Sequence, residues 1–231
     1  MSKTQKKIPN RIPEGESIND HGEMPIEEIN AQFKKRMREY RNFVDFIISI
    51  LNLKDHSKVL EIGTGPAWIS IILIKKNPTI HLTGLEISKD MIRIAEQNIK
   101  DERVENNITF VLGNAKDMSI FESKSFDAVI SHDSLHHWVE PLKIFNEIAR
   151  VLKNDGVLCI GDGRRDIGLG AKTIFNIAKL FISKQMSYYW KTSIMASYTP
   201  DELREMLNQT DLKGLFELTA DLFEIVIHNK Y

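Results

Sequence analysis

Val59-Leu60-Glu61-Ile62-Gly63-Thr64-Gly65-Pro66-Ala67-Trp68 is the stretch that decides the fold of this chain. An apolar run typical of a β-strand ends beside an acidic residue, and two glycines one residue apart precede a second apolar run. Glycine lets the backbone turn sharply after a strand, and it has no Cβ to keep a ligand away. The helix that starts after such a turn presents unpaired N–H groups to that ligand. The stretch therefore predicts a strand, a loop for a nucleotide-type cofactor, and a helix.

Beyond this stretch, short apolar runs alternate with amphipathic segments. Strands and helices at this spacing indicate a mostly parallel sheet covered on both faces, which is a doubly wound α/β fold. The last two runs lie too close together for an intervening helix, so they predict an antiparallel C-terminal hairpin. Lys153-Asn154-Asp155-Gly156 predicts a turn before the fifth strand. The predicted strands are 58–62, 80–85, 108–112, 126–131, 157–161, 215–219 and 223–228, and the predicted helices are 67–76, 89–100, 141–152, 172–183 and 200–209.

Additional segments flank and interrupt this alternation. Residues 1–24 are polar and contain proline and glycine, which predicts a mobile arm or a lid that orders on binding. Residues 25–53 place apolar side chains at helical spacing and predict N-terminal cap helices. Residues 166–198 are rich in aromatic residues and predict a helical cap insertion. We expect residues 25–231 to form a single domain.

Composition limits the class of protein. The chain has 231 residues, of which 42% are hydrophobic and 27% charged, as in ordinary soluble globular proteins. The formal net charge of −1 gives no overall attraction to nucleic acid or to an anionic membrane. Cys159 is the only cysteine, which excludes an internal disulfide and a cysteine-based zinc site. No apolar run reaches the roughly 18 residues of a spanning helix. We expect a cytoplasmic protein with no nucleic-acid partner and no membrane insertion.

Three side chains narrow the choice of cofactor. A dinucleotide loop has a third glycine where this chain has Trp68, which is too bulky for close helix–strand packing. Glu61, just before the first glycine, would repel a pyrophosphate but suits the cationic amino-acid end of S-adenosylmethionine. Glu86 ends the second predicted strand, where a carboxylate can accept hydrogen bonds from both ribose hydroxyls. The pattern favours S-adenosylmethionine over a nicotinamide cofactor.

With these features the sequence resembles the class I S-adenosylmethionine-dependent methyltransferases. The resemblance covers roughly residues 53–161, with its elements in the right order and spacing. It implies a Rossmann-like fold, S-adenosylmethionine as methyl donor, and S-adenosylhomocysteine as product. The matching segments are 59–65 for the first motif, 84–88 with Met91 for the second, 113–115 after the third strand, 126–130 for the fourth strand, and 144–158 for the entry to the fifth.

The resemblance also implies which residues hold the cofactor. Glu61 would flank the methionine moiety, Glu86 would hold the ribose, and Ile87 with Met91 would pack against the adenine. Asn114 and Ala115 would contact the adenine edge. The full implied set is Glu61, Gly63, Thr64, Gly65, Glu86, Ile87, Met91, Asn114, Ala115 and Ser131.

Two positions depart from the family pattern. Ala67 replaces a third glycine, a change we expect to be sterically mild. Asn114 replaces the usual acid after the third strand, and its side-chain carbonyl can still accept a hydrogen bond from the adenine amino group.

The segment after the fourth predicted strand, 132–138, is the predicted place of methyl transfer, because ligands bind beyond the carboxyl ends of parallel strands. His132 and His136 are candidate bases, since histidine titrates in the useful range, and Asp133 is a candidate partner. The alternative is that these histidines only support the loop. Several ligand-type side chains this close together rarely coordinate well, so no metal is expected.

The cap segments supply candidate substrate contacts. Arg164 and Arg165 follow the fifth predicted strand and could clamp an anionic group. Alternatively, they pair with Asp162, Asp166 or the helix that starts at Pro200. Tyr198, at the end of the insertion, is a further candidate for the substrate. Arg36 and Tyr40 lie on an N-terminal helix, and the sequence does not say which way they face.

The leading interpretation is a methyltransferase that acts on a small molecule, because the cap is compact and the charge is balanced. A peptide or protein acceptor is one alternative. A regulatory protein that binds the cofactor without catalysis is another. A homodimer is compatible with the sequence, and O, N, S and C nucleophiles all remain open.

Overall fold

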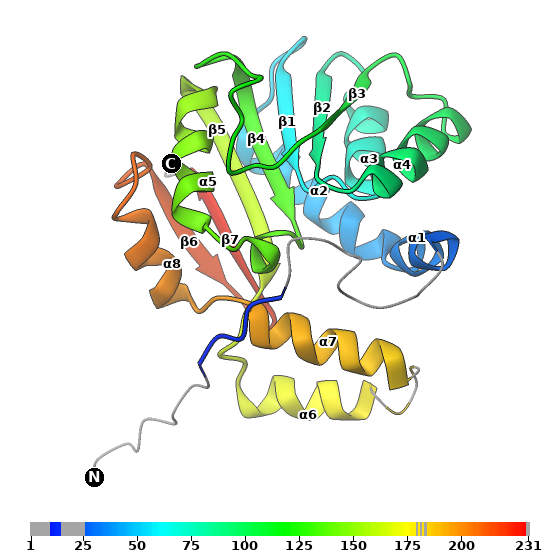
Figure 1. The fold of residues 1–231 in the computed structure, drawn as a ribbon, viewed down its shortest axis with the longest axis vertical. Coiled ribbons are helices and arrows are strands. Elements are labelled where there is room, and N and C mark those ends of the chain that lie inside the picture. Colours follow the sequence, from blue (N-terminus) through cyan, green and yellow to red (C-terminus); the bar gives the residue numbers. More distant parts are fainter. Residues whose placement is uncertain (1–9, 15–25, 179, 181, 183, 230–231) are drawn as a thin grey trace.

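The computed structural model describes residues 10–14, 26–178, 180, 182 and 184–229. Strands and helices alternate through the central part of the chain, as predicted (Figure 1). The elements are α1 Ile26–Lys35, α2 Met37–Leu51, β1 Lys58–Ile62, α3 Trp68–Lys76, β2 His81–Glu86, α4 Lys89–Asp101, β3 Ile108–Leu112, β4 Phe126–His132, the 3₁₀-helix η2 Leu135–His137, α5 Pro141–Val151, β5 Leu152–Gly163, α6 Leu169–Ala178, α7 Lys184–Ala196, α8 Pro200–Leu207, β6 Phe216–Ala220 and β7 Glu224–Asn229.

The strands form one seven-stranded sheet in the order β3-β2-β1-β4-β5-β7-β6. Strands β1 to β5 pair in parallel, whereas β7 runs antiparallel to both β5 and β6. The Rossmann-like, doubly wound fold and its antiparallel C-terminal hairpin are therefore confirmed. The chain leaves β1 in one direction toward β2 and returns on the other side at β4, so the carboxyl ends of β1 and β4 flank the switch point where such sheets bind ligands.

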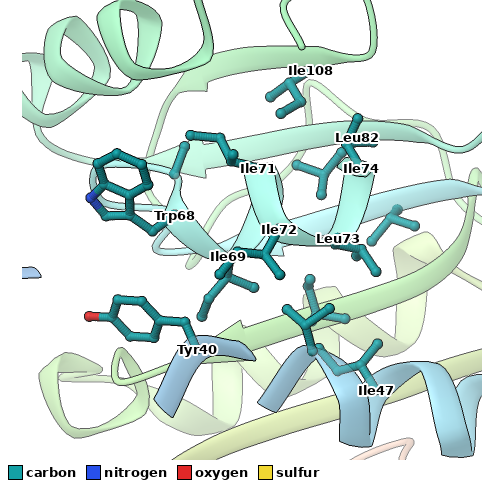
Figure 2. Close-up of a cluster of buried hydrophobic side chains, with 14 of the residues drawn as sticks. Tyr40, Ile47, Trp68, Ile69, Ile71, Ile72, Leu73, Ile74, Leu82 and Ile108 are labelled. Carbon is teal, nitrogen blue, oxygen red and sulfur yellow. The ribbon is translucent and has the colours of Figure 1, made fainter. Parts of the chain in front are cut away.

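One face of the sheet is covered by α2, α3 and α4. Helix α3 is apolar on all sides, and every residue from Trp68 to Ile74 is buried. Figure 2 shows the reason: α3 lies between the sheet, represented by Leu82 and Ile108, and α2, which contributes Tyr40 and Ile47. This packing fixes the start of α3, and hence the glycine loop before it, against the sheet.

The opposite face is covered by α5 and α8. Phe145 and Ile148 of α5 and Leu203 of α8 are fully buried against strands β4, β5 and β7. Helix α8 starts with a capping box, in which the Thr199 hydroxyl accepts from the Glu202 N–H and the Glu202 carboxylate accepts from the Thr199 N–H. The predicted start of this helix at residue 200 is confirmed.

Two predicted details are wrong. The predicted turn at 153–156 is instead an irregularity inside β5: Phe126 pairs with Leu152 but Ala128 pairs with Val157, so extra residues bulge from β5. The helix predicted at 172–183 corresponds to α6, which ends at Ala178, and a second helix that was not predicted, α7, follows at Lys184–Ala196. No proline or glycine punctuates the sequence between them, so it offered no signal for the break.

Residues 10–14 lie outside the sheet and contact the cap. The Ile12 N–H donates to the Met195 carbonyl of α7 at 2.9 Å. The Arg11 guanidinium donates to the carbonyls of Ala196 and His136, and it stacks on the Tyr198 ring at 4.1 Å. The rest of the predicted arm, 1–9 and 15–24, lies outside the described residues, so its mobility stays a prediction. In the part of the chain that is described, every helix is too short or too polar to cross a bilayer.

Candidate active site

A cavity lies at the carboxyl ends of β1, β2 and β4, with α1 and α2 contributing to its lining. The predicted cofactor loop forms one wall, and the segment after β4 forms another. Its lining residues are Phe33, Tyr40, Glu61, Ile62, Gly63, Thr64, Gly65, Pro66, Trp68, Ile69, Leu85, Glu86, Ile87, Met91, Gly113, Asn114, Ala115, His132, Asp133, Ser134, His137, Trp138 and Ile144.

The two glycines of the loop have left-handed backbones, with φ of 70° at Gly63 and 50° at Gly65. Gly63 also needs space: a Cβ added there would lie 2.2 Å from the Ser134 Oγ. Nothing lies within 4 Å of a Cβ added at Gly65, so only its backbone conformation favours glycine. Of the two glycines, only Gly63 lies close to a side chain of the segment after β4.

Ala67, at the N-cap of α3, departs from the expectation of a mild substitution. Its φ is 64°, a left-handed conformation that costs a non-glycine residue about 1 kcal/mol or more. The strain at this position is in the backbone. The buried face of α3 holds the turn in place in spite of that strain.

Glu86 is buried and fixed by backbone donors. Its Oε2 accepts from the Gly65 N–H and its Oε1 from the Ser88 N–H, each at 2.9 Å. Burial raises the pKa of Glu86, although these backbone hydrogen bonds oppose the rise. Its Oε2 accepts from the glycine loop and its Oε1 from the N-cap residue of α4, and each oxygen can accept a further hydrogen bond, so Glu86 is oriented for a ligand with two neighbouring hydroxyls.

Glu61 is buried at the bottom of the cavity. Its Oε2 accepts from the Thr64 hydroxyl at 2.9 Å and from the Ser70 hydroxyl of α3. Burial raises the pKa of Glu61 to about 7, and no lysine or arginine among the described residues forms an ion pair with it. A buried carboxylate with hydroxyl donors but no cation is a fitting partner for a positively charged ligand group.

Most other residues of the predicted cofactor set also line the cavity, namely Thr64, Ile87, Met91, Asn114 and Ala115. Ser131 is the exception. Its hydroxyl is buried and donates to the Ile62 carbonyl at 2.8 Å, so it ties β4 to β1 and does not line the cavity.

A polar network that the sequence did not predict holds α1 over the glycine loop. The Trp68 indole N–H donates to the Asn30 side chain at 3.0 Å. The Asn98 amide of α4 donates to the Pro66 carbonyl at 2.8 Å and also contacts Asn30. Trp68, whose bulk argued against a dinucleotide, therefore links the loop to the cap helix. A pair of asparagines 68 residues apart leaves no readable signal in the sequence.

His132 and Asp133 lie together on the cavity wall. The His132 Nδ1 is 3.4 Å from the Asp133 Oδ2, and the aromatic rings of Tyr40 and Phe43 pack against the imidazole. Burial lowers the pKa of His132, but the Asp133 carboxylate outweighs it, so the pKa of His132 is raised. Arg36, the N-cap residue of α2, forms an ion pair with Asp133.

Arg36 and His132 also affect the pKa of Asp133. Burial raises that pKa, but the two cationic neighbours outweigh burial and hold it well below its usual value. The N-terminal helices therefore face this part of the site with Arg36 and Tyr40, a point that the sequence left open.

His136 faces away from this cavity. Its Nδ1 contacts the Asp162 Oδ1 at 2.9 Å, and its backbone N–H donates to the Asp162 Oδ2 at 2.9 Å. Burial lowers the pKa of His136, but Asp162 outweighs it and raises the pKa. Of the two histidines, the structure brings only His132 to the cavity wall and gives His136 the supporting role that the sequence allowed as the alternative. Its neighbour His137 lines the cavity and was not singled out.

The two predicted substrate contacts also lie away from the cavity. Arg164 forms a bidentate pair with Asp166, with distances of 2.8 and 2.9 Å, and Arg165 pairs with Glu202 of α8. These are the alternative partners that the sequence left open. The Tyr198 hydroxyl donates to the Trp138 carbonyl at 3.2 Å, and its ring lies in a separate hollow beside Arg11 and α8.

Among the described residues, two groups of side chains place three ligand-type atoms within 4.8 Å of one another: Glu14 with His136 and His137, and Glu39 with His132 and Asp133. In the second group, Arg36 pairs with both acids and already supplies the positive charge. In the first group, the Nδ1 of His136 already contacts the carboxylate of Asp162.

Comparison with known proteins identifies the family. The model of a family described as "Methyltransferase domain" matches residues 53–211, which contain all five parallel strands and the cap helices α6 and α7. The chain belongs to this methyltransferase family. It uses S-adenosylmethionine as its cofactor, and the glycine loop, Glu61 and Glu86 all line the cavity.

Curated relatives agree with this assignment. The chain is 28% identical over 182 residues to the demethylmenaquinone methyltransferase of Thermotoga maritima, covering 74% of this chain and 76% of that one. It is 25% identical over 194 residues to the demethylmenaquinone methyltransferase of Bacillus subtilis, covering 83% and 82%.

Solved structures show the same fold. An S-adenosylmethionine-dependent methyltransferase from Aquifex aeolicus superposes with a TM-score of 0.67 at 15% identity, covering 90% of this chain and 98% of that one. The plantazolicin methyltransferase BamL, solved with S-adenosylhomocysteine, superposes with a TM-score of 0.61 at 21% identity, covering 84% and 68%.

Proposed function

We propose that this methyltransferase acts on a small molecule with an ionisable ring hydroxyl, and that His132 takes the proton of that hydroxyl. The observation that carries the proposal is the buried His132 beside the half-buried Asp133 on the wall of the cavity. Loss of the proton makes a phenol-type oxygen, or a carbon of the same ring, nucleophilic enough to accept a methyl group. The relatives named as demethylmenaquinone methyltransferases support a small ring-containing acceptor.

One set of residues would hold the cofactor, and another would prepare the acceptor. Bound S-adenosylmethionine supplies a methyl group that its sulfonium charge makes electrophilic. Glu86 and the loop around Gly65 would hold its ribose, and Glu61 its amino group. Asn114 and Met91 line the part of the cavity where the adenine would bind.

On the acceptor side, Asp133 orients His132 and stabilises its protonated form, which makes the imidazole a stronger base. Arg36 keeps Asp133 ionised for this role. Tyr40 and Trp138 would enclose the acceptor in apolar surroundings and exclude water, which favours alignment for in-line transfer.

A pH–rate profile tests the role of His132. A panel of phenols, catechols and hydroquinones is offered, with amines and thiols for comparison, and formation of S-adenosylhomocysteine is measured by mass spectrometry. Since only neutral imidazole can accept a proton, kcat/KM should rise with pH through a midpoint above 6.5, the ordinary value for histidine. In an Asp133→Asn variant, burial still lowers the pKa of His132 but the carboxylate that raises it is gone, so the midpoint of the profile should fall.

His132→Gln should lower kcat by about 100-fold or more with little change in cofactor affinity. His81→Gln, on the exposed start of β2, is the matched control and should behave as the wild type. Full turnover by His132→Gln would remove this residue from the chemistry, and turnover of peptides alone would show the acceptor class to be wrong.

We also propose that the enzyme works in the cytoplasm. A homodimer is compatible with the sequence, and its test is the oligomeric state of the protein in solution.

A further inference from the structure

The hairpin of α6 and α7 exposes an unusual amount of apolar surface. Of the ten residues of α6, only Ala171 is buried. A single exposed apolar side chain is ordinary, but a group of them on one element indicates an interaction surface. The exposed apolar side chains of this hairpin, with their exposed fractions, are Leu169 at 68%, Ile174 at 52%, Ile177 at 54%, Leu180 at 79%, Tyr188 at 63% and Trp190 at 38%.

The same hairpin has a one-sided charge. Residues 167–200 contain four lysines and no aspartate or glutamate. The whole chain has a net charge of −1, so the remaining residues carry −5 (−1 − 4). Lys172, Lys184 and Lys191 are exposed on α6 and α7. Positive charge and exposed apolar side chains therefore coincide on one element, while the rest of the molecule is acidic.

The position of the hairpin leaves this surface uncovered by the described part of the chain. Figure 1 shows α6 and α7 side by side beyond the ends of the strands, with α6 on the outside. The rings of Phe175 and Trp190 join the two helices at a centroid distance of 5.2 Å. Helix α7 contacts η2 and residues 10–14, whereas α6 faces outward.

We propose that the α6–α7 hairpin docks on the surface of an anionic lipid bilayer. Exposed Leu and Ile side chains would enter the boundary between headgroups and acyl chains, and Tyr188 and Trp190 suit the same depth. The lysines would lie at the level of the anionic headgroups. This docking is interfacial, which is compatible with helices too short to span. It does not depend on the identity of the methyl acceptor.

Charge argues for lipid over a second copy of this chain. A two-fold symmetric contact through this face would bring the lysines of one hairpin against those of the other, without an acid on either to compensate. An anionic bilayer instead attracts every lysine at once.

Vesicle binding followed by tryptophan fluorescence tests the proposal on the full chain. Trp68 and Trp138 are buried, with 5% and 4% exposed, whereas Trp190 is 38% exposed, so the emission change on binding reports the hairpin. Vesicles of phosphatidylcholine with phosphatidylglycerol should bind the protein and shift its emission to the blue. Vesicles of phosphatidylcholine alone should bind several-fold less, and high salt should reduce the difference.

Two sets of variants separate the charge from the apolar contribution. Each of Lys172→Gln, Lys184→Gln and Lys191→Gln should weaken binding to anionic vesicles by about five-fold. Ile174→Ser with Ile177→Ser should weaken binding to both kinds of vesicle. The controls are Lys54→Gln, Lys100→Gln and Lys213→Gln for charge, and Ile120→Ser, 70% exposed in the segment between β3 and β4, for apolar surface.

Trp190→Phe should abolish the blue shift while co-sedimentation persists. Equal effects of hairpin and control variants, or no preference for anionic vesicles, would overturn the proposal. A solution dimer that Ile174→Ser converts to a monomer would also overturn it and would assign the face to a second copy. Melting temperatures and S-adenosylmethionine binding, measured in parallel, show that each variant is folded.

Discussion

Helices α3 and α6 are about equally apolar, yet the structure treats them in opposite ways. Every residue of α3 from Trp68 to Ile74 is buried, whereas α6 buries only Ala171. The difference lies in what precedes each helix. A tight glycine loop turns α3 back from β1 onto the sheet, between the strands and α2. Helix α6 instead follows β5 out beyond the sheet, where no strand lies beneath it.

This comparison shows that an apolar helix is buried only where another part of the molecule covers it. The sequence of the helix alone does not identify that partner. For α3 the partner is the sheet, and its burial positions the cofactor loop. For α6 we propose a lipid surface. Four predictions test how sharply the two regions differ.

The largest difference is expected between two glycine substitutions. Gly63→Ala adds a Cβ 2.2 Å from the Ser134 Oγ at a φ of 70°, so strain and overpacking together should reduce the free energy of unfolding by about 4 kcal/mol. Gly170→Ala in α6 meets nothing within 4 Å and should stabilise by about 0.5 kcal/mol, since glycine is a poor helix residue. Denaturant unfolding measures both. Equal effects would show that the loop can relax and that the comparison fails.

A pair of isoleucine truncations comes next. Ile71→Ala, 2% exposed in α3, should cost about 3 kcal/mol through lost burial and a residual cavity. Ile177→Ala, 54% exposed in α6, should change the free energy of unfolding by less than about 0.5 kcal/mol. Thermal and denaturant unfolding without lipid give the values. A cost above 2 kcal/mol at Ile177 would mean that α6 is packed in solution.

The third prediction concerns Glu61, which Ser70 ties to α3. Its pKa is raised from 4.5 to about 7, so the folded protein holds this proton more tightly than the unfolded chain. The contribution of Glu61 to the free energy of unfolding is therefore greatest at low pH. It decreases by up to about 3 kcal/mol as pH rises from about 4.5 to about 7. Glu61→Gln should remove this pH dependence and be the more stable protein at pH 8 without cofactor.

Calorimetry supplies the second half of that test. Affinity for S-adenosylmethionine should increase as Glu61 ionises, and Glu61→Gln should lose both the affinity and its pH dependence. Parallel pH–stability curves for the wild type and Glu61→Gln would contradict the raised pKa.

The smallest expected effect in free energy is on ligand binding at Glu86. Glu86→Ala removes a carboxylate that Gly65 and Ser88 orient, and should weaken S-adenosylhomocysteine binding by about 30-fold, roughly 2 kcal/mol. Lys172→Gln in α6 is the control and should leave that affinity unchanged. Tight binding of NAD by the wild type would contradict the cofactor assignment.

Much of the cofactor side was predictable because its residues are local in sequence. The strand, glycine loop and helix at 58–76 lie within one continuous segment, and Glu86 ends the next strand. The acceptor side was predicted less well. His132 and His136 are four residues apart and chemically alike, but the 3₁₀-helix between β4 and α5 turns one to the cavity and the other to Asp162. That choice depends on β5, which lies far along the chain.

The local charge of the α6–α7 hairpin was also not apparent from the properties of the whole sequence. A net charge of −1 predicted no attraction to an anionic surface, since an average over the chain conceals a segment of four lysines without acids. The segment is visible in the sequence once its place is known. Its importance follows only from exposure, because the same apolar residues buried as in α3 would have no surface to offer.

The sequence by itself determined the order of the strands, the glycine loop and the two carboxylates that line the cavity, because periodicity and backbone freedom are properties of neighbouring residues. Only the tertiary structure decided that Arg36 pairs with Asp133, that Asn30 holds Trp68, and that α3 is buried while α6 is not. The physical reason is that burial and pairing are relations between segments, and each segment alone is compatible with several partners.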